Sequence, residues 1–202
     1  MSESEKIVFQ AQDVQLYHLG PYNLDIKKGE IAGISGPSGA GKTLFLRACA
    51  DLEPHEGQLF LENKPASEFN PAEWRKKVTF LSTLSQWWYD KVGDHFSAMN
   101  TDWLNQLGFD ESVYQWTVSR LSSGERQRLA VLRVLLLKPM VLLLDEPTSN
   151  LDGNNVKRVQ DLIISYQNDK MASILWVSHS KEQIESLADR HYWLENGTLA
   201  EL

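Results

Sequence analysis

The amino-acid sequence predicts an α/β fold with a mainly parallel sheet, an N-terminal antiparallel β subdomain and an inserted α-helical subdomain. Apolar runs such as "MVLLLD" and "ASILWVS" have the pattern of fully buried strands and alternate with helical stretches, which is typical of a parallel sheet covered on both faces. Strand-like segments crowd the first third of the chain. Residues 85–117, in contrast, show helix and loop patterns without a strand. Together these observations predict the three parts of the fold.

Composition and charge set the class of protein. With 202 residues, 42% of them hydrophobic and 23% charged, the chain has the size and composition of one globular domain. The formal net charge of −7 argues against nucleic acid as the main partner, because non-specific affinity for nucleic acid comes from basic side chains that neutralise phosphates. A single cysteine, Cys49, cannot form an internal disulfide, which favours a reducing compartment.

Neither a signal peptide nor a membrane span is expected. The start of the chain, "MSESEKIVFQ", is charged and lacks the apolar run of a signal peptide. The longest apolar runs, such as "VLLLD", are far too short to span a bilayer. We therefore expect a chain that is soluble by itself and that depends on another protein for any work at a membrane.

The first third of the chain predicts three strands and a buried helix. The strands are "KIVFQAQDVQLY", "YNLDIKKGE" and "EIAGISG", and the last of them runs into the helix "KTLFLRACADL". This helix is apolar nearly all round, so it is expected to be buried, with Cys49 serving as a packing residue. Two short strands follow, at "GQLFLEN" and "KVTFLS".

The second half predicts the alternation of a parallel sheet. A helix from Gly124 to about Leu137 precedes the strand "MVLLLD", and a helix over about Asn155–Gln167 precedes the strand "ASILWVS". A helix beginning "SKEQIESLAD" and a closing strand pair, "HYWLENGTLAEL", complete the chain.

The segment "GPSGAGKT", Gly36 to Thr43, matches the phosphate-loop pattern G-x-x-x-x-G-K-[ST]. Its glycines allow the backbone to curl so that successive N–H groups point at phosphate oxygens. Lys42 adds a positive charge for the β- and γ-phosphates, and the Thr43 hydroxyl can bind Mg²⁺. Because the motif follows a strand and opens a helix, it predicts a phosphate-binding loop of the P-loop NTPase kind, with Mg²⁺ beside the phosphates.

An acidic pair follows the buried strand "VLLLD". Asp145 and Glu146 are expected at the carboxyl end of that strand, where parallel sheets present their ligands. Asp145 would hold Mg²⁺, directly or through water, and Glu146 would polarise the attacking water. His179 ends the next strand, and adjacent strands would bring it near the γ-phosphate, where it could hold the water and Glu146 in line. Ser180 and Gln183 have the spacing of a capping box for the following helix.

A Ser-Ser-Gly turn in "RLSSGERQRL" opens the predicted helix at Gly124. The start of a helix presents free backbone N–H groups and a positive dipole end, so it can bind an anion. Ser122 and Glu125 also have capping-box spacing. The segment around this turn contains no nucleophile and no second glycine loop, so the phosphate it would bind has to come from elsewhere.

In their order along the chain, these motifs resemble the ATP-binding cassette (ABC) ATPase family over essentially the whole sequence. They are the phosphate loop, the signature "LSSGE" (Leu121–Glu125), the acidic strand (Val141–Glu146), "SNLD" (Ser149–Asp152) and the switch histidine His179. The resemblance implies an ATPase that works as a head-to-tail dimer, in which the signature helix of one copy caps the γ-phosphate bound by the other. It also implies that an aromatic residue near the first strand, here Tyr17, stacks on adenine.

The resemblance assigns site residues to this sequence. The nucleotide contacts are Tyr17, Gly36, Pro37, Ser38, Gly39, Ala40, Gly41, Lys42, Thr43, Ser122, Ser123, Gly124 and Asp152. Glu146 and His179 are the catalytic residues, and Thr43 and Asp145 are the metal ligands.

Two positions depart from the family pattern. The family has a glutamine at the junction from core to helical lobe that reaches Mg²⁺ and the attacking water. Here that place falls on Thr83, and the nearest glutamine, Gln86, lies three residues later. Either Thr83 stands in or the loop is shifted and Gln86 serves as the metal ligand. Ser123 replaces the commoner glycine of the signature, while Ser122 and Gly124 remain.

The resemblance implies one ABC ATPase domain over residues 1–202, with a catalytic core of about 1–83 and 138–202 and a helical subdomain of about 84–137. Trp87, Trp88, Trp103 and Trp116 lie in that subdomain, where they suit either an interface anchor or core packing of a small lobe.

The function implied is that of a transporter ATPase subunit. It would bind a second copy of itself and a separately encoded transmembrane permease subunit at the cytoplasmic face of the inner membrane. The stretch "ASILWVSHSKEQIESLADR" is similar to the compact ATPases assigned to bacterial metal or iron export. The alternative is a soluble, non-transport ABC ATPase that acts on a macromolecular complex.

Overall fold

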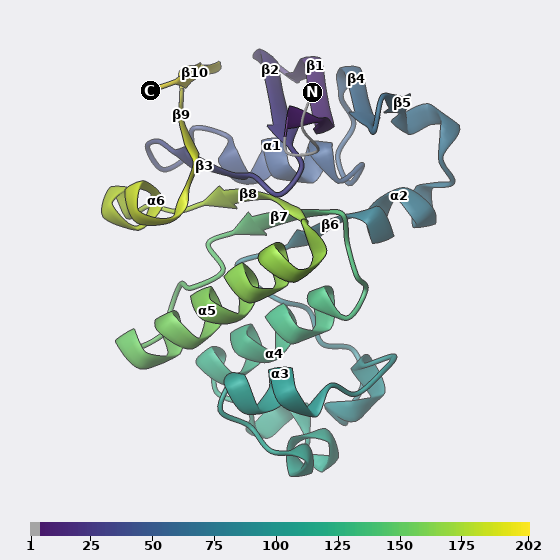
Figure 1. Cartoon of the computed structure of the whole chain (residues 1–202), viewed down its shortest axis with the longest axis vertical. Helices are drawn as coiled ribbons and strands as arrows, with labels where there is room; N and C mark the ends of the chain where they lie inside the picture. The colour runs from purple at the N-terminus through teal and green to yellow at the C-terminus, as the bar shows by residue number, and fades with distance from the viewer. Residues whose placement is uncertain (1–4) are drawn as a thin grey trace.

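A six-stranded sheet forms the centre of the structure, a computed structural model that describes residues 5–202 (Figure 1). Its strands, in spatial order, are β10 (Thr198–Glu201), β9 (Arg190–Glu195), β3 (Ile31–Ser35), β8 (Ser173–Val177), β7 (Val141–Asp145) and β6 (Val78–Leu81). All neighbours are parallel except β9 and β10. Every residue of β3, β7 and β8 is buried, as expected for parallel strands covered on both faces. The α/β fold class is therefore confirmed.

An antiparallel sheet precedes this core. Its strands, in spatial order, are β2 (Leu19–Lys27), β1 (Ile7–Leu16), β4 (Glu56–Leu61) and β5 (Lys64–Pro65). Each neighbouring pair is antiparallel, which confirms the predicted N-terminal subdomain. The predicted single domain begins at residue 1, and residues 1–4 lie outside the described range.

Two hydrophobic clusters lie on opposite faces of the central sheet. Successive residues of β7 point to opposite faces: Val141 and Leu143 join one cluster and Leu142 and Leu144 the other. The first cluster contains helix α1 (Lys42–Cys49) and the antiparallel strands. Burial raises the pKa of the Cys49 thiol and makes this cysteine a packing residue, as predicted.

The second cluster contains the longest helices. These are α4 (Ser123–Leu135) and α5 (Gly153–Lys170), with α6 (Lys181–Leu187) at the end of the same face. Figure 1 shows α5 and α4 below the central strands and α1 above them. Both α4 and α5 begin within two residues of the predicted starts.

Helix α2 (Pro71–Lys77) was not predicted. Asn70 caps it by accepting a hydrogen bond from the Ala72 N–H, and proline occupies the first helical position. An Asn-Pro pair of this kind is a recognised start signal for a helix. The preceding short segment η2 (Ala66–Glu68) is a single 3₁₀ turn.

Helix and turn, without a strand of either sheet, occupy the chain between β6 and β7. This segment holds η3 (Gly93–His95), α3 (Thr101–Gln106), η4 (Glu111–Gln115), η5 (Val118–Arg120) and α4. Buried residues of this lobe, such as Leu104 and Val113, belong to the same cluster as Leu142 and Leu144 of β7. The lobe is thus packed continuously against one face of the sheet, at the lower end of the view in Figure 1.

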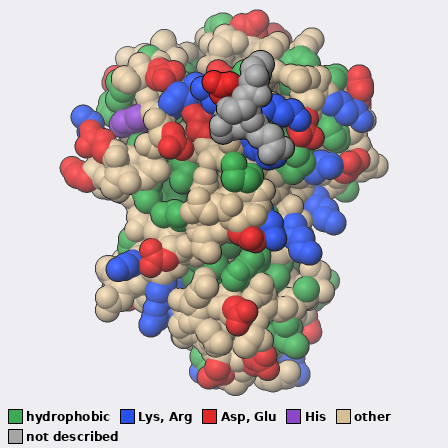
Figure 2. All heavy atoms as spheres, viewed as in Figure 1, with side chains coloured by type: hydrophobic (Ala, Val, Ile, Leu, Met, Phe, Trp, Pro, Cys, Tyr) green, Lys and Arg blue, Asp and Glu red, His purple; other side chains and the backbone are tan. Residues whose placement is uncertain are grey.

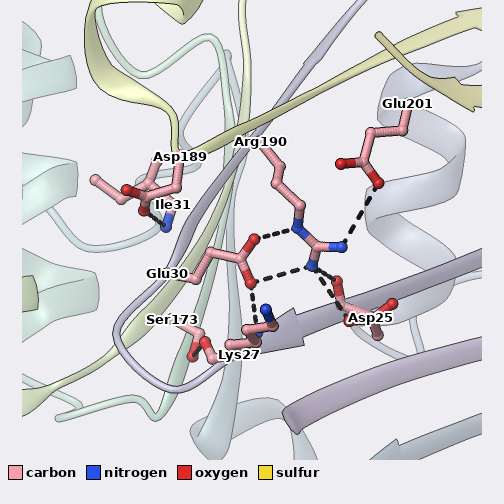
Figure 3. Close-up of polar contacts among 8 residues, drawn as sticks. All are labelled: Asp25, Lys27, Glu30, Ile31, Ser173, Asp189, Arg190 and Glu201. Carbon is pink, nitrogen blue, oxygen red and sulfur yellow. Dashed lines mark hydrogen bonds and ion pairs between the residues drawn. The ribbon is translucent and has the colours of Figure 1, made fainter. Parts of the chain in front are cut away.

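Arg190 at the start of β9 links the two sheets (Figure 3). Its guanidinium pairs with Glu30 and with Asp25 of β2, 3.2 Å from the Asp25 Oδ2, and Glu201 of β10 lies 3.7 Å from Nη1. Glu30, which is 7% exposed, also accepts a hydrogen bond from the Lys27 N–H. The side-chain contacts with Glu30 raise the pKa of Arg190 and keep it charged. This network fixes the antiparallel sheet against the strand that leads into the phosphate loop.

Figure 2 shows acidic and basic side chains interspersed over one face of the molecule. Within residues 5–202, no helix is both long enough and apolar enough to cross a membrane.

Candidate functional site

The predicted phosphate loop connects β3 to α1. Gly36 has φ +148°, and a Cβ there would lie 2.1 Å from the Leu194 carbonyl oxygen of β9. Gly41 has φ +99° and is the N-cap residue of α1. Both positions therefore require glycine, one for space and both for a backbone conformation that other residues rarely adopt. The loop ends at the N-terminus of α1, where free N–H groups favour an anion.

Lys42 is buried and points back into the loop. Its Nζ donates hydrogen bonds to the carbonyl oxygens of Gly36, at 2.8 Å, and Pro37, at 2.9 Å. Burial lowers the pKa of Lys42, and the negative charges of Glu146 and Asp145 oppose this shift. The ammonium group thus lies between the loop and the acidic end of β7.

Asp145 at the end of β7 accepts hydrogen bonds from two threonines. The Thr43 hydroxyl donates to Asp145 Oδ2 at 2.9 Å, and the Thr83 hydroxyl donates to the same oxygen at 3.1 Å and to the Asp145 carbonyl oxygen at 3.0 Å. Gln86 is exposed and makes no hydrogen bond to the residues that the structure describes. Of the two open alternatives, the structure hydrogen-bonds Thr83 to Asp145 and records no such bond for Gln86 among the described residues.

Glu146 and His179 are in direct contact. His179 Nε2 lies 2.6 Å from Glu146 Oε1, close enough for an ion pair when the imidazole carries a proton on both nitrogens. The sheet order explains this contact, because β8 lies beside β7 and their carboxyl ends meet at one edge. Glu146 has φ +50°, a left-handed conformation that is strained for a residue with a side chain. Its N–H donates to the Val177 carbonyl oxygen at 3.1 Å, which holds it at this edge.

The predicted capping box at α6 is half correct. The Ser180 side chain accepts a hydrogen bond from the Gln183 N–H, as expected of an N-cap. The Gln183 side chain does not return to Ser180. It instead accepts a hydrogen bond from the Ser178 hydroxyl, at 2.7 Å, and donates one to the Thr148 hydroxyl, at 2.9 Å. The Gln183 amide bonds these two hydroxyls instead of Ser180, because one lies on its oxygen side and the other on its nitrogen side.

The Ser-Ser-Gly turn begins α4 with a complete capping box. The Ser122 hydroxyl accepts from the Glu125 N–H at 3.2 Å, and the Glu125 carboxylate accepts from the Ser122 N–H at 2.8 Å. This backbone hydrogen bond lowers the pKa of Glu125. Ser122 and Ser123 are exposed, and within residues 5–202 no side-chain hydrogen bond joins Ser122, Ser123 or Gly124 to the phosphate loop.

The "SNLD" segment packs against this turn in the same chain. A Cβ at Gly124 would lie 3.2 Å from the Leu151 side chain, and Gln127 donates to the Pro147 carbonyl oxygen at 3.3 Å. Asp152 is exposed and caps α5 by accepting from the Asn155 N–H at 3.0 Å. That hydrogen bond lowers the pKa of Asp152. The start of α4 is thereby tied to the loop that follows Glu146.

Tyr17 lies in the turn between β1 and β2, with 71% of its surface exposed and φ +54°. It is not a strand residue, although the predicted first strand "KIVFQAQDVQLY" ended on it, because β1 stops at Leu16. Two residues later, Leu19 approaches the phosphate loop, since a Cβ at Gly41 would lie 2.9 Å from the Leu19 side chain. The Tyr17 ring is therefore open to solvent on a turn beside the loop.

One of the four lobe tryptophans is largely exposed. Trp88 has 63% of its surface exposed, next to Tyr89 at 52% and Leu84 at 74%. The other three are half-buried: Trp87 lies under Arg133, Trp103 packs on Tyr166 and Trp116 lies under Arg120.

Sequence reasoning missed the residue that holds this exposed segment. His95 is buried, and its Nε2 accepts hydrogen bonds from the backbone N–H groups of Trp88, at 2.9 Å, and Tyr89, at 3.0 Å. Its Nδ1 donates to the Lys91 carbonyl oxygen at 3.0 Å. No pattern in the sequence distinguishes this histidine from an ordinary lobe residue.

The site residues lie at the carboxyl ends of β3, β7 and β8, and they can perform three kinds of chemistry. The phosphate loop can bind an anion, the hydroxyl and carboxylate oxygens around Asp145 can bind a hard cation, and the Glu146–His179 pair can accept and hold a proton.

Comparisons with known proteins agree with this geometry. The family described as "ABC transporter" matches residues 19–149. The chain is 31% identical over 193 residues to the probable iron export ATP-binding protein FetA of Escherichia coli (strain K12), which covers 89% of this chain and 85% of that protein. The fold is similar to cbiO1 from Clostridium perfringens, part of the ABC transporter complex cbiONQ, with a TM-score of 0.77, 22% identity and coverage of 97% and 88%. It is also similar to the ATP-binding cassette MJ0796, a dimer bound to ADP and Pi, with a TM-score of 0.78, 21% identity and coverage of 96% and 98%.

Proposed function

The chain belongs to the ABC transporter family, and we propose that it is the ATP-hydrolysing subunit of a transporter whose membrane-spanning subunit is encoded separately. Two copies bind ATP and close face to face, and hydrolysis reopens them. This cycle drives the membrane subunit from the cytoplasmic face of the inner membrane. Similarity to an iron export ATP-binding protein supports metal or iron as the cargo. Residues of about 1–83 and 138–202 form the catalytic core, and about 84–137 form the lobe that faces the membrane subunit.

The contact between Glu146 and His179 is the observation that carries this proposal. The carboxylate lies just after the end of β7, with the phosphate loop two strands away and His179 two residues after β8, the strand between them. In our mechanism Glu146 polarises the attacking water and His179 holds the carboxylate in line. Phosphoryl transfer needs little else from a protein beyond positioning and charge stabilisation.

The phosphate loop binds the ATP phosphates in this mechanism. The loop N–H groups and the positive end of α1 face the phosphate oxygens, and Lys42 adds its charge from within the loop. Tyr17 stacks on the adenine from the turn beside Leu19.

The oxygens around Asp145 fit Mg²⁺. Magnesium prefers oxygen ligands and is usually held by one or two carboxylates together with substrate phosphates. Thr43 and Asp145 supply a hydroxyl and a carboxylate 2.9 Å apart, and Thr83 adds a second hydroxyl that orients the carboxylate. When bound there, Mg²⁺ would neutralise charge on the β- and γ-phosphates. We assign the role of the family's junction glutamine to Thr83 rather than to Gln86.

The signature turn completes the site of the other copy. Ser122 and Ser123 are exposed at the start of a 13-residue helix, whose first turn leaves backbone N–H groups without intrahelical partners. A phosphate from a second copy would satisfy them. Asp152 follows Leu151, whose side chain lies against this turn, and we assign it to the same composite site.

Mixing two inactive variants tests the composite site. Lys42→Ala disables the phosphate loop, and Ser122→Tyr blocks the signature turn, so neither variant alone should hydrolyse ATP. A mixed dimer still has one intact site, built from the loop of one chain and the turn of the other. We expect an equal mixture to recover a measurable fraction of the activity of the unaltered protein. The limit is about a quarter, because half of randomly formed dimers are mixed and each mixed dimer has one intact site of its two.

Phosphate release measures that recovery. The control mixes Lys42→Ala with a second phosphate-loop variant, Gly41→Val, which leaves no intact site in any dimer. Full activity of Ser122→Tyr by itself would show that each copy has a complete site.

The exposed segment Leu84, Trp88 and Tyr89 is the anchor for the membrane subunit in this proposal. Large aromatic side chains in such positions often supply most of an interface's free energy. We expect Trp88→Ala to weaken capture of the multi-span protein encoded in the neighbouring reading frame by about thirtyfold or more, which corresponds to the roughly 2 kcal/mol of an interface hot spot. The measurement is co-purification in detergent.

Leu52→Ala is the matched control, because Leu52 is also exposed but lies far from the lobe in the sequence, after α1. Equal capture of both variants would place the interface elsewhere. Failure of the unaltered chain to bind any such membrane protein would favour the soluble, non-transport alternative.

A further inference from the structure

Gln183 connects the two segments that carry Glu146 and His179. Its amide oxygen accepts from the Ser178 hydroxyl at 2.7 Å, and its amide nitrogen donates to the Thr148 hydroxyl at 2.9 Å. Ser178 directly precedes His179, and Thr148 lies two residues after Glu146. The oxygen and the nitrogen of the Gln183 amide therefore join these two segments by one hydrogen bond each.

Ser178 extends this connection to the phosphate loop. It is 6% exposed, its N–H donates to the Ile34 carbonyl oxygen of β3 at 3.3 Å, and its hydroxyl accepts from the Ser180 N–H at 3.1 Å. Ile34 lies two residues before Gly36, where the phosphate loop begins. Hydrogen bonds thus run from β3 through Ser178 and Gln183 to the loop after β7.

The backbone at Glu146 needs such support. Its left-handed conformation, φ +50°, is maintained only where the surrounding structure holds it. The Glu146 N–H and carbonyl are anchored by Val177 and by the Ser149 N–H, both at 3.1 Å. Gln183 adds a side-chain contact from α6 to the same loop at Thr148.

We propose that Gln183 is a positioning residue for hydrolysis, which sets the approach of the Glu146 carboxylate to the His179 imidazole. This inference rests on the proposed function, because it assigns the pair a role in the reaction. Gln183 itself contacts neither the phosphate loop nor Lys42 among the residues described here, so its effect is on the reaction and not on ATP binding.

Gln183→Met tests the proposal. Methionine has a similar length and removes both hydrogen bonds, which leaves the Ser178 and Thr148 hydroxyls without this partner. We expect kcat to fall by about tenfold, because the segments that carry Glu146 and His179 lose both hydrogen bonds that join them, while the KM for ATP stays within about twofold. The control is Gln160→Met: Gln160 lies on α5 and lines the same hollow beside His179, and no side-chain hydrogen bond to the described residues is lost.

A second measurement does not depend on activity. In ¹H–¹⁵N spectra of the imidazole groups, the His179 Nε2 signal should reflect its 2.6 Å contact with the Glu146 carboxylate. We expect this signal to move toward that of a free imidazole in Gln183→Met and to stay in place in Gln160→Met.

The outcomes separate this inference from the proposed function. If the unaltered chain does not hydrolyse ATP, the proposed function is wrong. If it does, and Gln183→Met keeps the kcat and the His179 signal of the unaltered chain, only the positioning role is wrong. A rise in the KM for ATP with unchanged kcat would also overturn it.

Discussion

Glu146→Gln is expected to bind ATP normally and to lose hydrolysis by about 10²–10⁴-fold, the usual contribution of a general base. Glutamine has the same shape as glutamate, and its amide oxygen can still lie beside His179 Nε2, which is 2.6 Å from the carboxylate. It cannot take up a proton from water. The site therefore stays intact while the step that breaks the γ-phosphate bond stalls.

A stalled site should also hold two copies together. In the proposed mechanism the dimer reopens only after hydrolysis, so Glu146→Gln with ATP and Mg²⁺ should elute as a dimer in size-exclusion chromatography. Phosphate release measures the loss of turnover. Glu73→Gln is the control, because Glu73 is an exposed carboxylate on α2. Turnover at the unaltered rate in Glu146→Gln would remove Glu146 from the mechanism.

Lys42→Ala should weaken ATP binding by about 100-fold, because a hydrogen bond to a charged group is worth about 1.5–3 kcal/mol and Lys42 would supply more than one. Lys42 is only 6% exposed, and its ammonium group donates to the Gly36 and Pro37 carbonyl oxygens. No other lysine of the phosphate loop can replace it, since the loop contains one.

Isothermal titration calorimetry with ATP measures this loss. Lys76→Ala is the matched control, because Lys76 is an exposed lysine on α2 and should leave affinity unchanged. Circular dichroism would establish that Lys42→Ala is folded. Retained affinity in a folded Lys42→Ala would mean that the phosphate loop does not bind ATP.

Local patterns in the sequence were sufficient for most of the fold and for the phosphate loop. The loop is a continuous segment, and the conformation of Gly36 and Gly41 follows from residue type and spacing. The buried strands β7 and β8 were predicted because short, continuous apolar runs fit best in the middle of a sheet. Helix α2 was missed although Asn70 and Pro71 mark its start, because its seven residues show no long apolar period.

Contacts between distant segments were harder to predict. The choice between Thr83 and Gln86 depends on how the chain leaves β6, and a shift of a few residues in that loop would reverse it. The partners of Gln183 lie five and 35 residues away, so spacing alone suggested the nearer Ser180. Which tryptophan is exposed depends on His95, whose ring is held by backbone groups of its own loop.

The sequence by itself determined the order of the motifs, the buried strands and the glycine-rich loop between β3 and α1, since each of these depends on neighbours along the chain. Only the tertiary structure decided which side chains meet. Glu146 contacts His179 because β7 and β8 are adjacent and parallel, and Asp145 receives both Thr43 and Thr83 because three separate segments end at one edge of the sheet. Such side-chain contacts are set by how whole strands and helices pack, and a pattern along the sequence does not specify them.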